Sequence, residues 1–362
     1  MKFLEYLRLM KEKITLIKPG QLVHLVIGNE SCDLDSMVSS MVLAFHYTCL
    51  EKYQNTIVLP MMNKTEQLFP VKVENIYLLD KYNISMDFLI YRDTINLETM
   101  QQECKMTVSL IDHHVLPEDL KFLKRSVVEV IDHRPVDTTE EWSDNVHIDI
   151  QLVGSCCTLI SSHINNHSVS QIALEMLYDV ITYDTIGYRE DAGKVKPMDL
   201  QVAEVLEKKL SIDPVVNRLQ RFEDINDAHR NISMLTTEQL LYKDLKIVGK
   251  IYVPGLPMLA QRFIQRTDIT EALAKFSRDN SAEVIIIMGL EVDDGHVCRD
   301  LALYTKMQEE AVTIESMLVT RFEVNKIPDK STDDIKYYTQ NNPKLSRKQL
   351  IPLLKSLDVE HV

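Results

Sequence analysis

Short apolar runs alternate with longer amphipathic segments along the first half of the chain. The run at 22–27 (LVHLVI) predicts a buried strand, and residues 35–50 predict the helix that follows it. Further strands are expected at 56–62, 88–91, 108–111, 127–131 and 146–153, and further helices at 170–186 and 196–210. This alternation predicts an α/β fold in which a parallel sheet carries helices on both faces. Ligands of such sheets bind beyond the carboxyl ends of the strands.

The second half of the chain predicts a second, smaller domain. Polar residues 213–231 indicate a connecting helix or linker, and TTEQ from Thr236 matches a helix capping box. Two apolar runs, 284–290 and 297–304, flank Asp293-Asp294-Gly295 and predict a hairpin with a DG turn. An exposed loop is expected at 328–344 and a closing helix at 347–357. The predicted domains are residues 1–225 and residues 226–362.

The charge balance narrows the class of partners. The chain has 362 residues, with 54 acidic and 40 basic side chains and a formal net charge of −14. Binding to duplex nucleic acid or to anionic lipid is disfavoured, because both depend on a basic surface. A polyanionic substrate is compatible with this charge only where metal ions or a local basic cluster reverse the field.

Cysteine usage and hydropathy predict a cytoplasmic or nucleocytoplasmic protein. The six cysteines form no CxxC pair, and a chain of this length needs no disulfide to stabilise its core. The N-terminal segment has amphipathic helical spacing rather than the continuous apolar stretch of a secretory signal. The longest apolar run, at 284–290, is far shorter than the roughly 20 residues that span a bilayer.

Polar clusters stand where the predicted strands end. They are NESCDLDS from Asn29 to Ser36, Asp112-His113-His114, Asp132-His133-Arg134 and, within an apolar helical pattern, Asp184. Taken singly, Asp33 and Asp35 match a helix N-cap followed by an acid in the first turn. A single strand that ends in Asp-His is equally ordinary. Together, however, carboxylates at neighbouring strand ends repel one another unless cations hold them.

The donor set of these clusters indicates which cations those are. Carboxylate oxygens with only one or two imidazoles suit Mg²⁺ or Mn²⁺ better than Zn²⁺. Two such ions a few ångströms apart are suited to in-line displacement at phosphorus. The residues alone therefore favour metal-dependent phosphate chemistry.

The order of the motifs resembles the DHH phosphoesterase superfamily: N-x-x-x-D-x-D-S, then D-H-H, then D-H-R-P, then a helical aspartate. GNESCDLDS and VIDHRP together resemble its prune/exopolyphosphatase branch, which is similar to family II inorganic pyrophosphatases. LTTEQLLYKD and LSRKQLIP resemble the associated C-terminal domain, so the resemblance covers nearly the whole chain. It implies a DHH catalytic domain over residues 1–225 and a smaller α/β substrate-binding domain over residues 226–362, with the active site in the cleft between them.

The resemblance also implies a role for each matched residue. The metal ligands would be Asp33, Asp35, Asp112, His133 and Asp184, which together hold two or more Mg²⁺ or Mn²⁺ ions. Asp33 and Asp35 would each bind one ion, Asp112 would bridge them, and His133 and Asp184 would complete the second site. Asn29 stands where the pyrophosphatases have a metal-binding histidine, so it binds either a metal or the substrate. An amide oxygen there favours Mg²⁺ over Mn²⁺.

The remaining candidates concern the substrate. Arg134 replaces the second histidine of the motif that names the superfamily, and a guanidinium can grip two phosphate oxygens. His113 and His114 either orient Asp112 and satisfy buried polar groups or lie near the substrate, so the expected catalytic set is Asp112, His113, His114 and Arg134. Ser346-Arg347-Lys348 matches a capping box, and the same helix N-terminus attracts phosphate. In the resembled family this segment closes over the substrate, so Arg347 and Lys348 are expected to bind it.

These inferences predict a metal-dependent exopolyphosphatase that hydrolyses short-chain inorganic polyphosphate through a water activated by two metal ions. Pyrophosphatase or cyclic-nucleotide phosphodiesterase activity at the same site is the first alternative. A signalling scaffold of the prune type is the second, with nucleoside diphosphate kinase as a possible partner. A single-strand nuclease fits worse, because that activity needs a basic groove with stacking aromatics, and only 7% of the residues are aromatic.

Overall fold

The chain folds into two compact units. The computed structural model describes residues 1–137, 139–164, 170–293, 296–306, 308–332 and 334–358. Unit 1 is Met1–His229 and unit 2 is Arg230–Val362. This division and the predicted boundary at 225 both fall within helix α8 (Pro214–Arg230), the polar segment for which a connecting helix or linker was expected.

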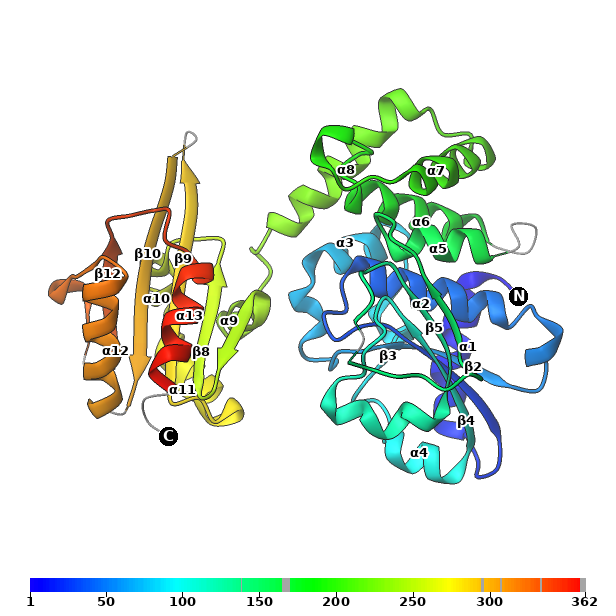
Figure 1. Ribbon diagram of the computed structural model, residues 1–362, viewed down its shortest axis with the longest axis horizontal. Coiled ribbons are helices and arrows are strands. Elements are labelled where there is room, and N and C mark those ends of the chain that lie inside the picture. The colour runs from blue at the N-terminus through cyan, green and yellow to red at the C-terminus, as the bar shows by residue number, and fades with distance from the viewer. Residues whose placement is uncertain (138, 165–169, 294–295, 307, 333, 359–362) are drawn as a thin grey trace. The chain divides into compact units, whose positions relative to one another are not determined.

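Unit 1 is built on a six-stranded sheet in which all paired strands run parallel (Figure 1). The strands are β1 (Leu22–Ile27), β2 (Ile57–Met62), β3 (Ile90–Tyr91), β4 (Lys105–Ile111), β5 (Val127–Asp132) and β6 (His147–Ile150). Their order in the sheet is β3-β2-β1-β4-β5-β6. The α/β class and the parallel sheet predicted from the hydrophobic pattern are therefore confirmed.

The helices of unit 1 pack around this sheet. They are α1 (Phe3–Lys13), α2 (Leu34–Tyr47), α3 (Val73–Lys81), α4 (Leu97–Glu103), α5 (Cys156–His163), α6 (Gln171–Asp184), α7 (Pro197–Leu210) and α8. Every residue of α2 is buried, because this helix contacts β1 and β2 as well as α5 and α6. A helix that is largely apolar around its circumference is stable only in such a position. The start of α2, which carries Asp33 and Asp35, is thus fixed by packing on several sides.

The strand order places a switch point between β1 and β4. From β1 the chain moves outward through β2 to β3, then crosses back to place β4 on the other side of β1. At such a point the connections at the carboxyl ends of the strands diverge and leave a crevice. Asp33 follows β1 and Asp112 follows β4, so the sheet topology brings two of the predicted acidic clusters to one crevice.

Unit 2 contains a mixed sheet in the order β11-β12-β10-β9-β8-β7 (Figure 1). The strands are β7 (Leu245–Val248), β8 (Ile251–Leu256), β9 (Val284–Asp293), β10 (His296–Thr305), β11 (Val324–Lys326) and β12 (Ile335–Gln340). The helices are α9 (Thr237–Lys243), α10 (Ala260–Ile264), α11 (Ile269–Asn280), α12 (Gln308–Arg321) and α13 (Arg347–Asp358). Ile286, Leu318 and Leu354 belong to one core cluster between the sheet and helices α12 and α13.

Within the described residues, unit 2 contains two of the features that the sequence predicts for the second half of the chain and lacks a third. The capping box at Thr236 is present, since its hydroxyl accepts from the Gln239 N–H, and β9 and β10 form the predicted antiparallel hairpin. The predicted turn lies outside the described residues at positions 294 and 295. The expected exposed loop at 328–344 is wrong, because β12 lies within it and pairs with both β10 and β11. Tyr337 and Tyr338 are buried there, so this short strand is stabilised by the sheet rather than by a long apolar run.

Within the described residues, no helix is both long enough and apolar enough to cross a lipid bilayer.

Candidate metal centre

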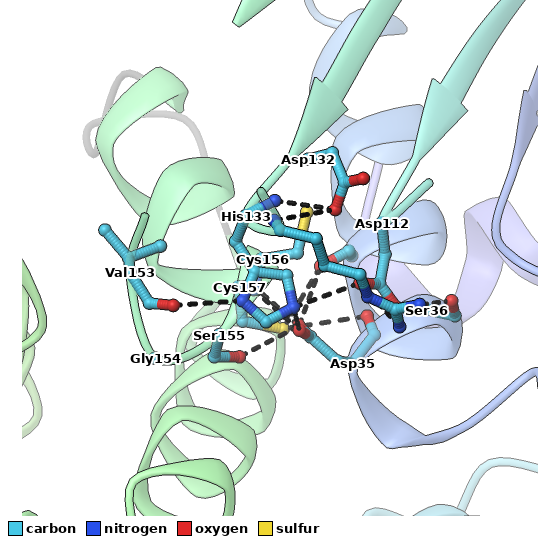
Figure 2. Close-up of polar contacts among 12 residues, drawn as sticks. Asp35, Ser36, Asp112, Asp132, His133, Val153, Gly154, Ser155, Cys156 and Cys157 are labelled. Carbon is cyan, nitrogen blue, oxygen red and sulfur yellow. Dashed lines mark hydrogen bonds and ion pairs between the residues drawn. The ribbon is translucent and has the colours of Figure 1, made fainter. Parts of the chain in front are cut away.

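Three side chains converge beyond the carboxyl ends of β1, β4 and β5 (Figure 2). Asp35 comes from the first turn of α2, Asp112 follows β4, and His133 follows β5. Each offers one potential ligand atom, and these atoms all lie within 4.8 Å of one another. They line a cavity of about 420 Å³ in unit 1, whose other lining residues include Asp33, Arg134, Gly154, Asp184, Lys194 and Lys196.

Asp35 is held by the start of helix α5. Its Oδ1 accepts hydrogen bonds from the Ser155 hydroxyl (2.9 Å) and the Cys157 N–H (2.8 Å), and its Oδ2 accepts from the Cys156 N–H (2.6 Å). Free N–H groups and the positive end of a helix favour a carboxylate at this position. The Gly154–Cys157 segment, which had no expected role at the site, thus fixes the orientation of a candidate ligand.

Asp112 adopts a left-handed backbone conformation, with φ of +62°, directly after β4. Aspartate tolerates this conformation better than most residues. Its Oδ2 accepts from the Asn29 amide and the Ser36 hydroxyl, both at 2.7 Å. Gly28 permits this approach, because a Cβ there would lie 2.8 Å from the Ser36 Cβ. Burial and the Asp35 carboxylate raise the pKa of Asp112 to about 7.

His133 presents Nε2 to both carboxylates. Its Nδ1 lies 3.0 Å from the Val153 carbonyl oxygen, to which it donates, while Nε2 lies 3.2 Å from Asp112 Oδ1 and 3.5 Å from Asp35 Oδ2. Burial lowers the pKa of His133, but the Asp112 and Asp35 carboxylates outweigh it and raise that pKa to about 10. A bond from Nδ1–H to a backbone carbonyl fixes the ring so that Nε2 can serve as a metal ligand.

Asp33 and Asp184 complete the acidic lining of the cavity. Asp33 caps helix α2 by accepting from the Ser36 N–H at 3.2 Å. Asp184 is the last residue of α6, and its Oδ2 is buried without a hydrogen-bond partner among the described residues. Burial raises the pKa of both carboxyl groups, and the Asp35 carboxylate raises it further.

This donor set fits divalent cations. Four carboxylates and one imidazole line one cavity, and two buried carboxylate oxygens, Asp112 Oδ1 and Asp184 Oδ2, accept no hydrogen bond within the described part of the chain. Such an arrangement is costly unless cations neutralise it. Hard oxygen donors with a single imidazole match Mg²⁺ or Mn²⁺.

The second Asp-His pair is arranged differently from the first (Figure 2). Asp132 is fully buried, and its Oδ1 accepts from the N–H groups of His133 (2.6 Å) and Arg134 (3.3 Å). Its Oδ2 pairs with Nδ1 of His114, whose Nε2 accepts from the Asp137 N–H at 2.7 Å. Asp132 therefore shapes the turn that presents His133 and Arg134.

His113 and His114 lie beside this turn. His113 Nδ1 donates to the Ile111 carbonyl at 3.0 Å, and burial lowers the pKa of its imidazole. Neither histidine belongs to the cavity lining in the described structure. Their expected catalytic role stays a prediction.

Comparison with known proteins places these residues in a family. Residues 223–357 match the DHHA2 domain. Over 345 residues the chain is 32% identical to mouse exopolyphosphatase PRUNE1, covering 92% of this chain and 75% of that protein. The chain belongs to the prune/exopolyphosphatase branch of the DHH phosphoesterase superfamily.

Other relatives agree with this membership. A putative exopolyphosphatase of Schizosaccharomyces pombe is 26% identical, with 91% of this chain and 89% of that protein covered. A putative family II inorganic pyrophosphatase of Methanococcus jannaschii has the same fold, with a TM-score of 0.51 at 17% identity. The match covers 92% of this chain and 98% of that structure. The DHH-type fold predicted from the motifs is thus confirmed.

Arg134, which stands in place of the second histidine of the D-H-H motif, lies at the candidate metal centre. Arg134 Nη2 is 3.5 Å from Asp112 Oδ1, and about half of its side chain is exposed to the cavity and solvent. Asn29 contacts the same aspartate, and its amide is engaged at both ends, because Nδ2 donates to Asp112 Oδ2 and Oδ1 accepts from the Cys32 N–H at 3.1 Å.

The two candidates in the DHHA2 domain occupy the start of α13. Arg347 is ion-paired with Asp244 and also donates to the Asp244 carbonyl, whereas Lys348 is exposed. Gln349 accepts from the Ser346 N–H at 2.9 Å, which is the backward bond of the predicted capping box. Substrate binding by Arg347 and Lys348 stays a prediction.

Sequence analysis missed two lysines of the cavity. Lys194 and Lys196 lie between α6 and α7 and line the cavity together with the acidic residues. The signal was a K-x-K pair before Pro197 at a helix start, where backbone N–H groups and lysines favour anions together. The pattern at 196–210 predicts a helix, and a helix start alone does not reveal that its lysines face an acidic cavity.

Proposed function

We propose that this protein is a metal-dependent phosphoanhydride hydrolase that releases phosphate from short-chain inorganic polyphosphate. The observation that carries the proposal is the convergence of Asp35, Asp112 and His133 within 4.8 Å, with Arg134 3.5 Å from Asp112. Carboxylates next to a half-exposed guanidinium suit a metal-bound phosphate, because the metal and the arginine neutralise its charge from different sides. The names of the PRUNE1 relatives and of the S. pombe relative support the same reaction class.

The ions that we propose are two or more Mg²⁺ or Mn²⁺, held by Asp33, Asp35, Asp112, His133 and Asp184. Bound there, they would supply a water of lowered pKa and neutralise charge at the phosphorus. Asp112 offers Oδ1 for sharing between ions, since its Oδ2 is occupied by Asn29 and Ser36. We therefore propose that Asn29 orients Asp112 and does not itself bind a metal.

The protein's own groups would orient the substrate. Arg134 can place two N–H groups on phosphate oxygens while its backbone is held by Asp132. His133 keeps its ring fixed through Val153, so its Nε2 stays directed at the carboxylates. We further propose that Arg347 and Lys348 contribute positive charge to the substrate, which for Arg347 requires release from Asp244.

A phosphate-release assay tests the proposal. The substrates are pyrophosphate, tri- and tetraphosphate, long polyphosphate and cyclic nucleotides, each with Mg²⁺ or Mn²⁺. Metal-dependent release that favours short polyphosphates and vanishes in Asp112→Ala is the expected result. Release from cyclic nucleotides alone would replace the substrate class, and no release from any substrate by metal-loaded protein would contradict the enzyme assignment.

A further inference from the structure

Lys194 and Lys196 combine an acidic surrounding with the lack of a carboxylate partner among the described residues. Lys81, Lys124 and Lys275, by contrast, each contact a carboxylate. Lys194 and Lys196 border a cavity with four carboxylates, yet neither forms an ion pair with any described residue. Among the described residues, the Lys196 ammonium group donates only to the Gly193 carbonyl oxygen, at 3.5 Å. Two unpaired cations therefore stand at the rim of an acidic cavity.

The loop that carries them, Gly193–Lys196, is fixed to the metal centre by a buried aspartate. Asp199 is fully buried and accepts from the Gly154 N–H (2.9 Å), the Thr158 hydroxyl (2.6 Å) and the Lys196 N–H (2.7 Å). Gly154 and Thr158 flank the Ser155–Cys157 segment that binds Asp35. The lysine backbone and a candidate metal ligand are thus held by the same short stretch of chain.

The packing between these two segments is tight. A Cβ on Gly154 would lie 2.6 Å from the Thr185 side chain, 2.8 Å from Asp199 Oδ2 and 3.2 Å from the Lys194 carbonyl oxygen. Only glycine allows the chain after β6 to come this close to the lysine loop. Thr185 follows Asp184 directly, so the loop is packed against the end of the helix that supplies one candidate ligand.

From this arrangement we infer that Lys194 and Lys196 bind the phosphate groups of the substrate that extend beyond Arg134. The inference rests on the proposed function, and it assigns part of the substrate recognition to unit 1 itself. Lysine acts here as a flexible point charge, whereas Arg134 provides a planar fork. A compact acidic centre holds the reacting phosphate through cations, and the two lysines neutralise the rest of the polyanion.

Equilibrium binding of methylenediphosphonate, a nonhydrolysable bisphosphonate, tests this inference without turnover. Calorimetric titration in Mg²⁺ compares wild type with Lys194→Ala/Lys196→Ala and with the control Lys208→Ala/Lys209→Ala. The control removes the same charge from the last turn of α7, about 18 Å along the helix. The loop variant should weaken binding by about tenfold or more, and the control by less than about twofold. Lys194→Arg/Lys196→Arg should restore most of the affinity.

Three outcomes would overturn the assignment: no binding to wild type, equal binding by the loop and control variants, or no rescue by arginine. Matching melting temperatures would exclude misfolding as the cause of lost affinity. Phosphate release by wild type is scored separately. If wild type releases no phosphate while bisphosphonate binding still depends on the two lysines, the proposed reaction fails and the lysine assignment stands.

Discussion

Strands β4 and β5 lie side by side and continue into the same tripeptide, Ile-Asp-His, yet the two strand ends serve opposite purposes. After β4, the aspartate Asp112 faces the carboxylate cluster and His113 turns back to the backbone. At the end of β5, the aspartate Asp132 is still part of the strand and accepts from backbone N–H groups, and His133 faces the cluster. One end supplies a carboxylate to the centre and the other supplies an imidazole.

The backbone explains this difference. Asp112 leaves the sheet in a left-handed conformation, whereas Asp132 is still a strand residue and its carbonyl accepts from the Gln151 N–H at 3.1 Å. In both cases the first residue after the strand reaches the centre, and this residue is the motif's aspartate after β4 but its histidine after β5. The same motif therefore directs a carboxylate to the centre after β4 and an imidazole after β5, because the two strands end at different residues of the motif.

The largest expected effect is a loss of turnover when Asp112, and not Asp132, is substituted. Asp112→Asn should lower kcat by on the order of a thousandfold, which corresponds to about 4 kcal/mol, because the centre loses a charged oxygen at its middle. The measurement is phosphate release from tripolyphosphate in saturating Mg²⁺. Unchanged circular dichroism would show that the fold survives. Wild-type turnover by this variant would remove Asp112 from the centre.

The next largest effect is a difference in kcat/KM between variants of His133 and of His113. His133→Gln should lower kcat/KM by about a hundredfold at limiting metal, since a ligand is lost, while His113→Gln should cost about tenfold or less. Excess Mn²⁺ should recover part of the activity of His133→Gln. A metal titration of activity makes this comparison. Equal losses in both variants would contradict the opposite roles of the strand ends.

In metal-free protein, the free energy of unfolding should depend on pH because the pKa of Asp112 is raised in the folded state. The folded state keeps the Asp112 proton up to the raised pKa of about 7, whereas the unfolded chain loses it near 3.8. The folded state binds more protons in that window, so its unfolding free energy falls as the pH rises, by on the order of 4 kcal/mol across the window.

Urea unfolding in a metal chelator between pH 4.5 and 7 measures this slope. Asp112→Asn should reduce it, and Asp132→Asn should leave it as in wild type. Some slope should persist in Asp112→Asn, because the pKa of Asp33 and that of Asp184 are also raised by burial. A slope that is insensitive to Asp112→Asn would place the buried proton elsewhere.

The smallest effect concerns the supporting role of Asp132. Asp132→Asn keeps one acceptor oxygen but weakens the bonds to the His133 and Arg134 N–H groups, and should cost about 1 kcal/mol of stability. Activity should fall by less than about tenfold, through a higher KM rather than a lower kcat, because Arg134 loses its fixed backbone. A kcat loss as large as that of Asp112→Asn would make the two aspartates equivalent.

Much of unit 1 followed from the sequence, because its strands are short apolar runs and its polar clusters mark the strand ends. The motif order indicated the family, and the metal-ligand candidates Asp35, Asp112 and His133 do lie together. The different directions of Asp112 and Asp132 could not be predicted, since they depend on a single backbone conformation. The roles of Gly154 and Asp199 depend on contacts between distant segments, which local patterns do not encode.

Unit 2 was harder to predict for the opposite reason. Strand β12 contains Lys336, Thr339 and Gln340, so its local composition resembles an exposed loop. Its pairing with β10 and β11 on both sides supplies the stabilisation that hydrophobicity does not. Strand formation there is a tertiary effect.

The most direct test of the account is the Mn²⁺ affinity of Asp112→Asn and Asp132→Asn, read from the free-ion signal in electron paramagnetic resonance. We expect the affinity to fall about a thousandfold for Asp112→Asn and about tenfold or less for Asp132→Asn. Equal losses, or a greater loss for Asp132→Asn, would contradict the claim that, of the aspartates in the two Asp-His motifs, Asp112 and not Asp132 holds metal.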